Sequence, residues 1–514
     1  MMKNADPRLD EGLRHRPSPI IVRTAPQTTT TLSASKNSTN QEESETTATS
    51  HSALSLRSLI SNQVALCTLP ILILVVIASL DNADKQLLAS SFPVLEKTLH
   101  LDVKTLGYFS LFSNLSYALS LPLWGYLMHK YGIAYVHVIL AGACASWGVA
   151  TIGIAVWSSS TIGQAILRST NGVMLGSILP LSQTLLVELV SVSMRGRAFG
   201  WMGLCEKLAG SLSSASVVYW EDHWQYSYWL LGSFSIVMAM VAYKVLNPST
   251  ILKNKSSSDP SRPFSPTKQD EPKLSLRQIV RRILRLPAFS CMVAQGVFGG
   301  TPWDMMSFLL LLNDWRGFTK EEIVSIQFTS GLTATIGAWL GGVLGDYAAA
   351  RAASKGRIFV AFISVVGGIP LYGLFLFAKS YRAGLLWINL FSLWATWTPS
   401  AALRPICADL TRNSSERAQI IAMWIVLEKA SGALFGAPLV GYLTSNMLGG
   451  DEADEPPAEK ARTLANNLFF LSSLFWTICA GFWIGMGMTI QQSLSISQAP
   501  DDKNAKASEM NPLV

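Results

Sequence analysis

The sequence Glu206-Lys207-Leu208-Ala209-Gly210-Ser211-Leu212 lies within a long apolar segment, and Glu428-Lys429-Ala430-Ser431-Gly432-Ala433-Leu434 lies within another. The Glu, Lys, Gly and Leu residues of the two stretches coincide position for position. A second correspondence joins Gly125-Tyr126-Leu127-Met128-His129 to Gly342-Val343-Leu344-Gly345-Asp346, and basic residues follow both. These matches predict two related halves; chance similarity between helices rich in small residues is the alternative.

Apolar segments long enough to cross about 30 Å of hydrocarbon recur from Val64 onward. Six precede a polar linker and six follow it, so we predict an all-α membrane protein with twelve transmembrane helices in two pseudo-symmetric six-helix bundles. The expected spans of the first half are 64–93, 105–128, 133–156, 161–190, 198–219 and 227–246. Those of the second half are 288–312, 322–346, 357–379, 383–410, 417–445 and 464–490.

The composition also favours lipid as the solvent. Charged residues make up 14% of the 514 residues, against roughly 25% in an ordinary soluble protein, and the mean hydropathy is +0.31. The net charge of +7 would suit a nucleic-acid partner, but the basic residues collect in short loops and one linker, as the positive-inside rule describes. We therefore expect no nucleic-acid partner. All six cysteines lie in apolar segments without a CxxC pair, so we expect neither disulfide, metal nor cofactor.

Polar segments precede and follow the apolar part. Residues 1–60 are rich in Ser, Thr, Asn and charge, so we expect a disordered cytoplasmic N-terminal tail. An organelle transit peptide is the alternative, which the acidic residues of this segment weaken. The N-terminal bundle then covers 64–246, the C-terminal bundle covers 287–490, and 491–514 are expected to form a disordered cytoplasmic C-terminal tail.

A polar linker, residues 247–286, separates the two expected bundles. Between Leu274 and Arg285, apolar residues alternate with arginines at helical spacing. This pattern predicts a basic amphipathic helix on an anionic membrane face, and a solvated linker is the alternative. The linker also bears on orientation. The short loops on the two sides carry eight Lys and Arg residues each, whereas the segment from Lys244 through Arg285 carries ten more. Both termini are therefore predicted to be cytoplasmic.

The stretch Arg168-Ser-Thr-Asn-Gly172-Val-Met-Leu-Gly176-Ser-Ile-Leu-Pro180 has an Arg followed by spaced glycines and a Pro, and Arg195-Gly196-Arg197 follows in the next loop. With the repeat and the loop from Gly125 to Gly132, this pattern resembles the major facilitator superfamily. The resemblance covers roughly residues 64–490. It implies two parallel six-helix repeats and a carrier that acts by alternating access.

The resemblance also implies a conformational motif in each half. In the family, an acid in the loop after the second helix helps to lock one conformation. His129 stands at that place in the first half, so Asp346 of the second half matches the lock better. The residues that the resemblance assigns to the motif are Gly125, His129, Lys130, Gly132, Arg197, Gly342, Asp346 and Arg417.

Within the superfamily, the chain is similar to the spinster-type lipid transporters. Their first helix has an Asp-Arg pair, which Asp84-Lys85 resembles, and Asn171-Gly172-Val173 matches their fourth helix. A Glu follows in that pattern, where Leu175 stands here. The departure implies that coupling through that carboxylate is absent from this chain. The similarity suggests a lysolipid or sphingolipid cargo in a plasma or endolysosomal membrane.

Charged residues within the first and fourth spans are candidates for substrate binding or coupling, because a charge at the bilayer centre costs at least about 2.5–3.5 kcal/mol unless it faces a cavity or partner. Asp81 and Lys85 are four residues apart and could form an ion pair. Asp84 then needs another partner, and the family arrangement suggests Arg168. Such a pair could couple transport to protonation, or it could be a static salt bridge.

The Glu-Lys pairs of the repeat and Asp304 complete the candidates. In Glu206-Lys207 and Glu428-Lys429, neighbouring residues point about 100° apart, so one can face a cavity and the other a neighbouring helix. They could equally be a structural bracket. Asp304 follows Gly299-Gly300-Thr301-Pro302-Trp303, a run that we expect to break or kink its helix. Trp303 and four other tryptophans could stack on a ligand, or could simply pack.

No P-loop, Ser/His/Asp arrangement or HExxH motif is present in the sequence, so we predict neither an ATP-driven pump nor an enzyme. The leading hypothesis is a monomeric secondary transporter or facilitator for a small molecule or lipid, surrounded by membrane lipids; if transport is active, protons or another ion would be coupled to it. A carrier for an organic anion, a sugar or a drug-like solute is the alternative, as is a non-transporting sensor on the same fold.

Overall fold

The computed structural model describes residues 68–131, 135–190, 195–247, 281, 285–411, 414–448 and 455–498. Within these residues the secondary structure is helical, and no strand occurs. The predicted N-terminal tail, the greater part of the predicted amphipathic helix and the last sixteen residues of the chain lie outside the described residues. The all-α prediction is thus confirmed for the part that the structure describes.

The helices of the first half follow the predicted spans closely. They are α2 (Leu69–Leu99), α3 (Val103–Tyr131), α4 (Val136–Val156), α5 (Thr161–Leu175), α6 (Ile178–Leu189), α7 (Arg195–Tyr219), the 3-10 helix η3 (Glu221–His223) and α8 (Gln225–Val245). α2 packs along α7, α4 along α8, and α3 along α5. Glycines allow these close approaches: Gly148 faces the Gly232 carbonyl across α4 and α8, and Gly172 faces the Ser113 carbonyl across α5 and α3.

The second half has more interruptions. Its elements are α11 (Pro287–Met305), the 3-10 helix η4 (Met306–Phe308), α12 (Leu309–Trp315), α13 (Lys320–Leu376), α14 (Tyr381–Ala395), the π-helix η5 (Pro399–Leu403), α15 (Arg404–Leu410), α16 (Ser414–Phe435), α17 (Ala437–Leu448) and α18 (Pro457–Gln498). α11 packs against α16 and α18, and α13 packs against α14 and α18.

α13 contains the reversal that separates two of the predicted spans. Ala352 and Ala353 leave the helical conformation, and Ala353 has a φ of 44°. Gly356 then lies against the Ala348 carbonyl, which a straight helix would place about 12 Å away at 1.5 Å per residue. Both arms contact α14, through Gly337 on one arm and Gly367 on the other. α13 is therefore a helical hairpin.

Among the described residues, five helical segments are long and apolar enough to cross a membrane by length and composition. They are Val136–Val156, Gln225–Val245, Lys320–Leu376, Ile420–Leu448 and Pro457–Ser497. The prediction named twelve spans, and the hairpin in α13 accounts for two of them within one segment. In others the apolar run is interrupted, since α2 carries Asp81, Asp84 and Lys85 in its middle.

Two boundary predictions were wrong. α18 continues to Gln498, so residues 491–498 are helical and not part of a disordered tail. The extension was not predicted because Ser493 and Ser497 look like surface residues in the sequence. In the structure, Ser493 is buried and accepts from the Ala288 backbone N–H, and Ser497 donates to the Leu410 carbonyl. In α11, the Gly299–Trp303 run remains helical, and the irregular turn is η4, beginning at Met306.

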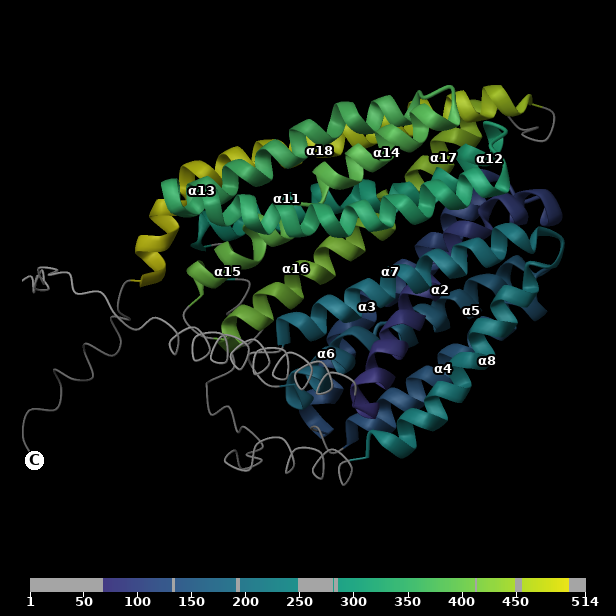
Figure 1. Ribbon diagram of the computed structural model, residues 1–514, viewed down its shortest axis with the longest axis horizontal. Helices are drawn as coiled ribbons and strands as arrows, with labels where there is room; N and C mark the ends of the chain where they lie inside the picture. Colours follow the sequence, from purple (N-terminus) through teal and green to yellow (C-terminus); the bar gives the residue numbers. More distant parts are fainter. Residues whose placement is uncertain are drawn as a thin grey trace, which may run out of the picture. The chain divides into compact units, whose positions relative to one another are not determined.

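α13, α14 and α18 lie along one flank of the described unit, and α4 and α8 lie along the opposite flank (Figure 1). α2, α3, α7, α11 and α16 run between them. We call the end where α2 finishes at Leu99 and α18 begins at Pro457 the distal end. Between the flanks, the second half contacts the first mainly where α16 and α17 meet α3 and where α13 meets α7.

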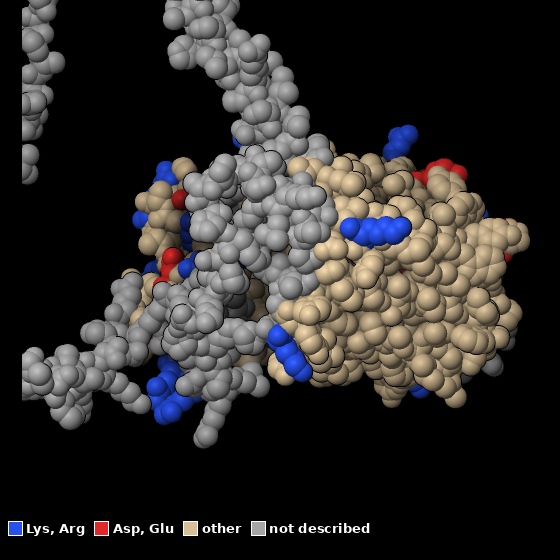
Figure 2. Space-filling view, turned by 90° about the horizontal axis from the view of Figure 1, so that it is seen from below, with Lys and Arg blue, Asp and Glu red and all other residues tan. Residues whose placement is uncertain are grey.

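One face of the helical unit is mostly uncharged. Figure 2 shows one face on which Lys, Arg, Asp and Glu are few and widely separated. Large apolar side chains are also exposed on the helices, among them Leu119, Ile162 and Met488. Extended apolar surface of this kind is rare on soluble monomers and suits contact with lipid.

Candidate functional site

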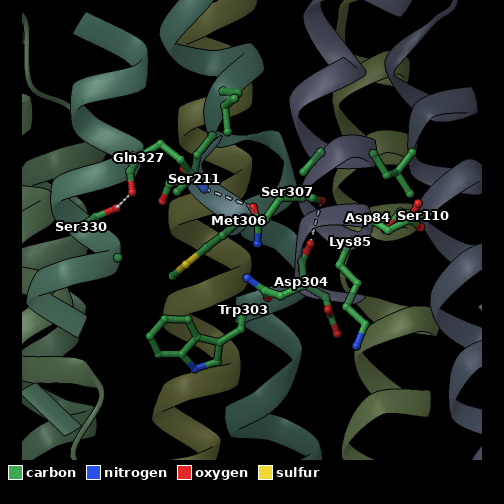
Figure 3. Close-up of a pocket in the computed structure, with 18 of the residues that line it drawn as sticks. Asp84, Lys85, Ser110, Ser211, Trp303, Asp304, Met306, Ser307, Gln327 and Ser330 are labelled. Carbon is green, nitrogen blue, oxygen red and sulfur yellow. Dashed lines mark hydrogen bonds between the residues drawn. The ribbon is translucent and has the colours of Figure 1, made fainter. Parts of the chain in front are cut away.

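A cavity of about 420 Å³ lies between the two halves, within the 300–1,000 Å³ typical of small-molecule sites. The first half contributes residues of α2, α3, α4, α5, α7 and α8, and the second contributes residues of α11, η4, α12, α13, α14 and α16. Its charged lining residues are Asp84, Lys85, Arg168, Lys207, Asp304 and Lys429. Figure 3 shows Asp84, Lys85 and Asp304 with the polar residues Ser110, Ser211, Gln327 and Ser330 around the space.

Lys85 forms the ion pair that its spacing predicted. Its Nζ lies 2.7 Å from Asp81 Oδ2 and 4.3 Å from the centroid of the Tyr117 ring. Asp81 is buried and is not part of the lining, whereas Lys85 reaches the cavity. The pair therefore neutralises one of the cavity's cations from within α2.

Asp84 does not form the expected pair with Arg168. Its two oxygens accept hydrogen bonds from Thr151 Oγ1 at 3.0 Å and from Asn171 Nδ2 at 2.9 Å. Asn171 lies one helical turn after Arg168 on α5, and its amide takes the place that the prediction gave to the guanidinium. The Asp84–Arg168 pair does not form in this conformation, in which neutral donors hold the carboxylate, and its role in coupling stays a prediction.

Arg168 is only 2% exposed, and its guanidinium carbon lies 4.9 Å from the centroid of the Phe109 ring. Its Nε and Nη2 atoms are buried without a hydrogen-bond partner among the described residues. Arg168 also lines the cavity. The guanidinium is therefore held in place by an aromatic ring while part of its donor capacity is unused.

The two Glu-Lys pairs divide as predicted. Lys207 and Lys429 line the cavity, whereas Glu206 and Glu428 are not among its lining residues. Glu428 lies against Gly300 of the neighbouring helix α11, and its carboxylate is 3.9 Å from Lys429 Nζ. In the first half, the backbone carbonyl of Glu206 accepts from Asn82 Nδ2 at 2.6 Å.

The repeat extends to the helix that each Glu-Lys segment contacts. Gly210 of α7 lies against the Asn82 amide of α2, and Gly432 of α16 lies against the Asp304 carboxylate of α11. The same sequence offset separates Gly210 from Gly432 and Asn82 from Asp304. The second half thus has a carboxylate where the first half has an amide.

The aromatic wall of the cavity belongs to the second half. Trp303 is 40% exposed, and its ring centroid lies 5.7 Å from that of Phe391. Phe375, Ile388 and Leu310 continue this wall. Figure 3 shows Trp303 beside Asp304 at the edge of the site. Of the five tryptophans considered as ligand platforms, Trp303 alone is among the lining residues of this cavity.

Several polar contributors were not predicted. Gln327 Nε2 donates to Gln86 Oε1 at 3.1 Å and so joins the two halves at the level of the cavity. Thr151 and Asn171 hold Asp84, although only Asn171 belonged to a motif that the sequence singled out. The other candidates were found because each is a charged residue within an apolar segment. Thr151 and Asn171 are neutral, so this criterion did not find them.

Ion pairs across the halves close the distal end. Lys97 lies 2.9 Å from Asp314, Lys320 lies 3.0 Å from Glu221, and Lys460 lies 3.1 Å from Glu96. Within the first half, Lys97 also lies 2.9 Å from Glu221. We refer to these six residues as the distal ion-pair network; they are Glu96, Lys97, Glu221, Asp314, Lys320 and Lys460.

Burial and additional hydrogen bonds strengthen the distal network. Glu96 also accepts from Trp315 Nε1 at 2.8 Å, and its pair with Lys460 is nearly buried, with side chains 15% and 11% exposed. Burial alone would raise the pKa of Glu221, but hydrogen bonds from Lys97 and Lys320 outweigh it and hold the pKa below its usual range. The network therefore keeps Glu221 ionised to a lower pH than an isolated Glu.

The predicted conformational motif is ordered in the second half. Asp346 accepts from Arg357 Nη2 at 2.6 Å across the α13 reversal, and Arg357 also donates to the Ala401 carbonyl at 3.1 Å. Arg417 Nε lies 3.3 Å from Thr411 Oγ1. Its role in conformational change remains a prediction.

In the first half, the motif residues are partly described. Gly125 and Arg197 are exposed, and the exposed Lys130 lies 5.3 Å from the centroid of the Tyr131 ring. Gly132 and the side chain of His129 lie outside the described part. Gly342 is the second-half counterpart of Gly125. A Cβ atom added at Gly342 would have the Ser400 side chain as its nearest neighbour.

A helical fold with a polar cavity between two halves is the architecture of a membrane transporter. Residues 71–436 match the family model described as Major Facilitator Superfamily. The chain belongs to the major facilitator superfamily, and it is a multi-pass membrane transporter, not an enzyme. No curated protein matches its sequence significantly.

Solved structures agree on the fold. A bacterial homolog of the human lysosomal transporter Spinster, inward-facing and unoccupied, gives a TM-score of 0.65 at 14% identity over 82% of this chain and 97% of the other. The nucleoside transporter NupG gives 0.55 at 13% identity over 83% and 99%. The inward-open xylose transporter XylE from E. coli gives 0.53 at 13% identity over 79% and 94%.

Proposed function

We propose that the protein is a secondary transporter whose twelve transmembrane helices form two six-helix bundles, residues 64–246 and 287–490, that move cargo by alternating access. The observation that carries this proposal is the cavity, which both halves line, below a distal end where ion pairs join the halves. The repeat-related packing of Gly210 and Gly432 supports the pseudo-symmetry.

This conformation has its closed gate at the distal end. The cavity then communicates with the side of the linker and the termini, which we propose to be the cytoplasm of a plasma or endolysosomal membrane. The likeness to two structures solved in inward-facing or inward-open conformations supports this assignment. We propose that the transporter acts as a monomer, because the cavity is complete within one chain.

The lining favours an amphiphilic cargo. Charged residues crowd the first-half side, and Trp303 and Phe391 form an apolar wall on the second-half side. A lysolipid or sphingolipid has both features, and the similarity to the Spinster homolog supports that choice. An organic anion or a drug-like solute would also use both sides. A neutral sugar would leave the cavity cations without an ionic partner.

Proton coupling is proposed to act through Asp304. Its carboxylate lines the cavity, and the charged groups that face it from α16 are Lys429 and the adjacent Glu428. Asp84, in contrast, is already held by two hydrogen bonds. A carboxylate that exchanges its ionic partner with the protonation state is a suitable coupling group.

Uptake by reconstituted vesicles tests the function. The purified full chain is placed in vesicles, and uptake of lysolipids, aromatic carboxylates and sugars is measured with and without a pH gradient. The proposal expects uptake above that of protein-free vesicles for an amphiphilic member, increased by the gradient. Binding without uptake of any member would favour a sensor, and uptake indifferent to the gradient would refute proton coupling.

A further inference from the structure

Arg168 has the position of a binding group that lacks its partner. It is buried, with only 2% of its surface exposed, and two of its guanidinium nitrogens have no hydrogen-bond partner among the described residues. Asp84, the carboxylate on a neighbouring helix, is already bonded to Thr151 and Asn171. A buried cation without a counter-charge is costly, so an anion that enters the cavity would offset this cost.

Lys207 offers a second cation to the same space. The other two cavity lysines have carboxylates nearby: Lys85 Nζ lies 2.7 Å from Asp81 and Lys429 Nζ lies 3.9 Å from Glu428. For Lys207 and Arg168, no carboxylate of the described part lies within ion-pair distance. Lys207 is exposed where α7 borders the cavity. Two of the four cavity cations are therefore available to a ligand.

An apolar platform lies on the other side of the cavity. The Trp303 indole is 40% exposed, and Phe391 supports it at a centroid distance of 5.7 Å. Ile388 and Leu310 extend the surface. Aromatic faces of this kind bind flat or aliphatic groups by burial of apolar area, and they would gain nothing from an inorganic ion.

We propose that the cavity binds an organic anion with an apolar body, its carboxylate or phosphate against Arg168 and Lys207 and its apolar part on Trp303. The proposal rests on the proposed function, because the bound anion is taken to be the cargo. Guanidinium and ammonium donors recognise both carboxylates and phosphates, so the anionic group can belong to a water-soluble acid or to an anionic lysolipid.

Binding to the purified full chain in nanodiscs provides the test. The probes are 2-naphthoate, its neutral amide 2-naphthamide, inorganic phosphate and lysophosphatidate, each measured by calorimetry. A charge-assisted hydrogen bond contributes enough to change affinity by about 10- to 100-fold. We expect 2-naphthoate or lysophosphatidate, or both, to bind at least tenfold more tightly than 2-naphthamide and inorganic phosphate.

Two variants locate the anionic group. Arg168→Gln and Lys207→Gln are each expected to remove the preference for the anionic probe, whereas Lys207→Arg should retain it. Lys355→Gln removes an exposed cation outside the cavity lining and should leave affinity unchanged. Because Arg168 is buried and its variant could fail to fold, Lys207→Gln, checked by size-exclusion chromatography, decides the result alone if necessary.

The outcomes separate the two proposals. Binding of 2-naphthamide as tightly as 2-naphthoate, binding of neither 2-naphthoate nor lysophosphatidate, or an undiminished preference in Lys207→Gln would overturn the anion site. Tight binding of inorganic phosphate alone would overturn the role of the apolar platform. Binding of lysophosphatidate without 2-naphthoate would support the site and assign the anion to a lipid. Anion binding without uptake in vesicles would contradict the transport function and leave the binding site intact.

Discussion

Charged residues at the distal end and charged residues in the cavity are paired in different ways. At the distal end, Lys97 with Asp314 and Glu96 with Lys460 join side chains from opposite halves. In the cavity, Asp81 with Lys85 and Glu428 with Lys429 are pairs within one helix. Pairs across the halves must break when the halves separate, and pairs within a helix persist. Under the proposed alternating access, the distal end is therefore the region where ion pairs would change and the cavity the region where they would be kept.

The largest effect is expected from breaking the buried distal pair. Glu96→Gln removes the charge opposite Lys460, and loss of one partner of a buried ion pair costs about 3–5 kcal/mol. The cost falls on the distal-closed state, so the distal-open state gains population. In a cysteine-free background, Ser330→Cys in the cavity should then react faster with a membrane-impermeant maleimide applied at the distal side.

Lys97→Met is the matched control for this prediction. The Lys97 side chain is 47% exposed, and exposed pairs contribute only about 0–1 kcal/mol. Its effect on the maleimide reaction should therefore be much smaller than that of Glu96→Gln. No acceleration in either variant would show that the distal network does not control access, and equal acceleration in both would show that the buried pair contributes no more than the exposed one.

The next effect concerns the carboxylate that distinguishes the second half of the cavity. Asp304→Asn makes this position resemble Asn82, its counterpart in the repeat. We expect the stimulation of uptake by a pH gradient to fall by roughly 5- to 150-fold, the range of typical coupling free energies between two sites. Binding of cargo, measured without a gradient, should change less.

The reciprocal variant, Asn82→Asp, sharpens the same comparison. It adds a carboxylate next to Gly210 but leaves Asp304 unchanged. If the double variant Asn82→Asp with Asp304→Asn recovered full gradient dependence, the two halves would be interchangeable and the assignment of coupling to the second half would be wrong.

Packing at the repeat glycines should give a comparable or smaller effect on stability. Gly432→Ala places a methyl group where the Asp304 carboxylate lies, and Gly210→Ala does the same at the Asn82 amide. Overpacking costs about 1–3 kcal/mol, so thermal unfolding in detergent should occur at lower temperature. Gly203→Ala, also in α7, meets no atom within 4 Å and should not destabilise. Destabilisation of Gly203→Ala to the same extent would point to a general intolerance of α7.

The smallest expected effect is the pH dependence that Glu221 gives to distal closure. Its pKa is held below the usual range by Lys97 and Lys320, so its contribution is complete near neutral pH and is lost as the pH falls through the lowered pKa. Distal closure, followed by the maleimide reaction, should be constant from pH 7 to about 5, above the ordinary Glu pKa of about 4.3. Glu221→Gln should reduce any change seen at lower pH. Opening near pH 6 in the native protein would contradict this assignment.

The sequence predicted the helical architecture and that the two members of each Glu-Lys pair point in different directions, because both depend on local spacing; it did not say which member faces the cavity. It also identified the Asp81–Lys85 pair, whose geometry is set by one turn of helix. Asp84 and Arg168 illustrate the limit: both are buried, but the choice between Arg168 and Asn171 as the partner depends on side-chain packing between helices.

The distal ion-pair network was missed for a related reason. Lys97, Lys320 and Lys460 were counted only as loop charges that bear on topology. Their partners come from distant parts of the chain, and no spacing rule connects Glu96 to Lys460. The length of α18 was likewise hidden, because Ser493 and Ser497 look like surface residues in the sequence and are buried in the structure.

Distances across the distal end test alternating access most directly. Spin labels at His100→Cys and Lys379→Cys, both exposed in distal loops of opposite halves, are measured by double electron–electron resonance in nanodiscs of the cysteine-free protein. The account predicts a predominant short distance in the otherwise native protein and a second, longer distance that gains population in Glu96→Gln. A single distance that is identical in both proteins would contradict a distal gate.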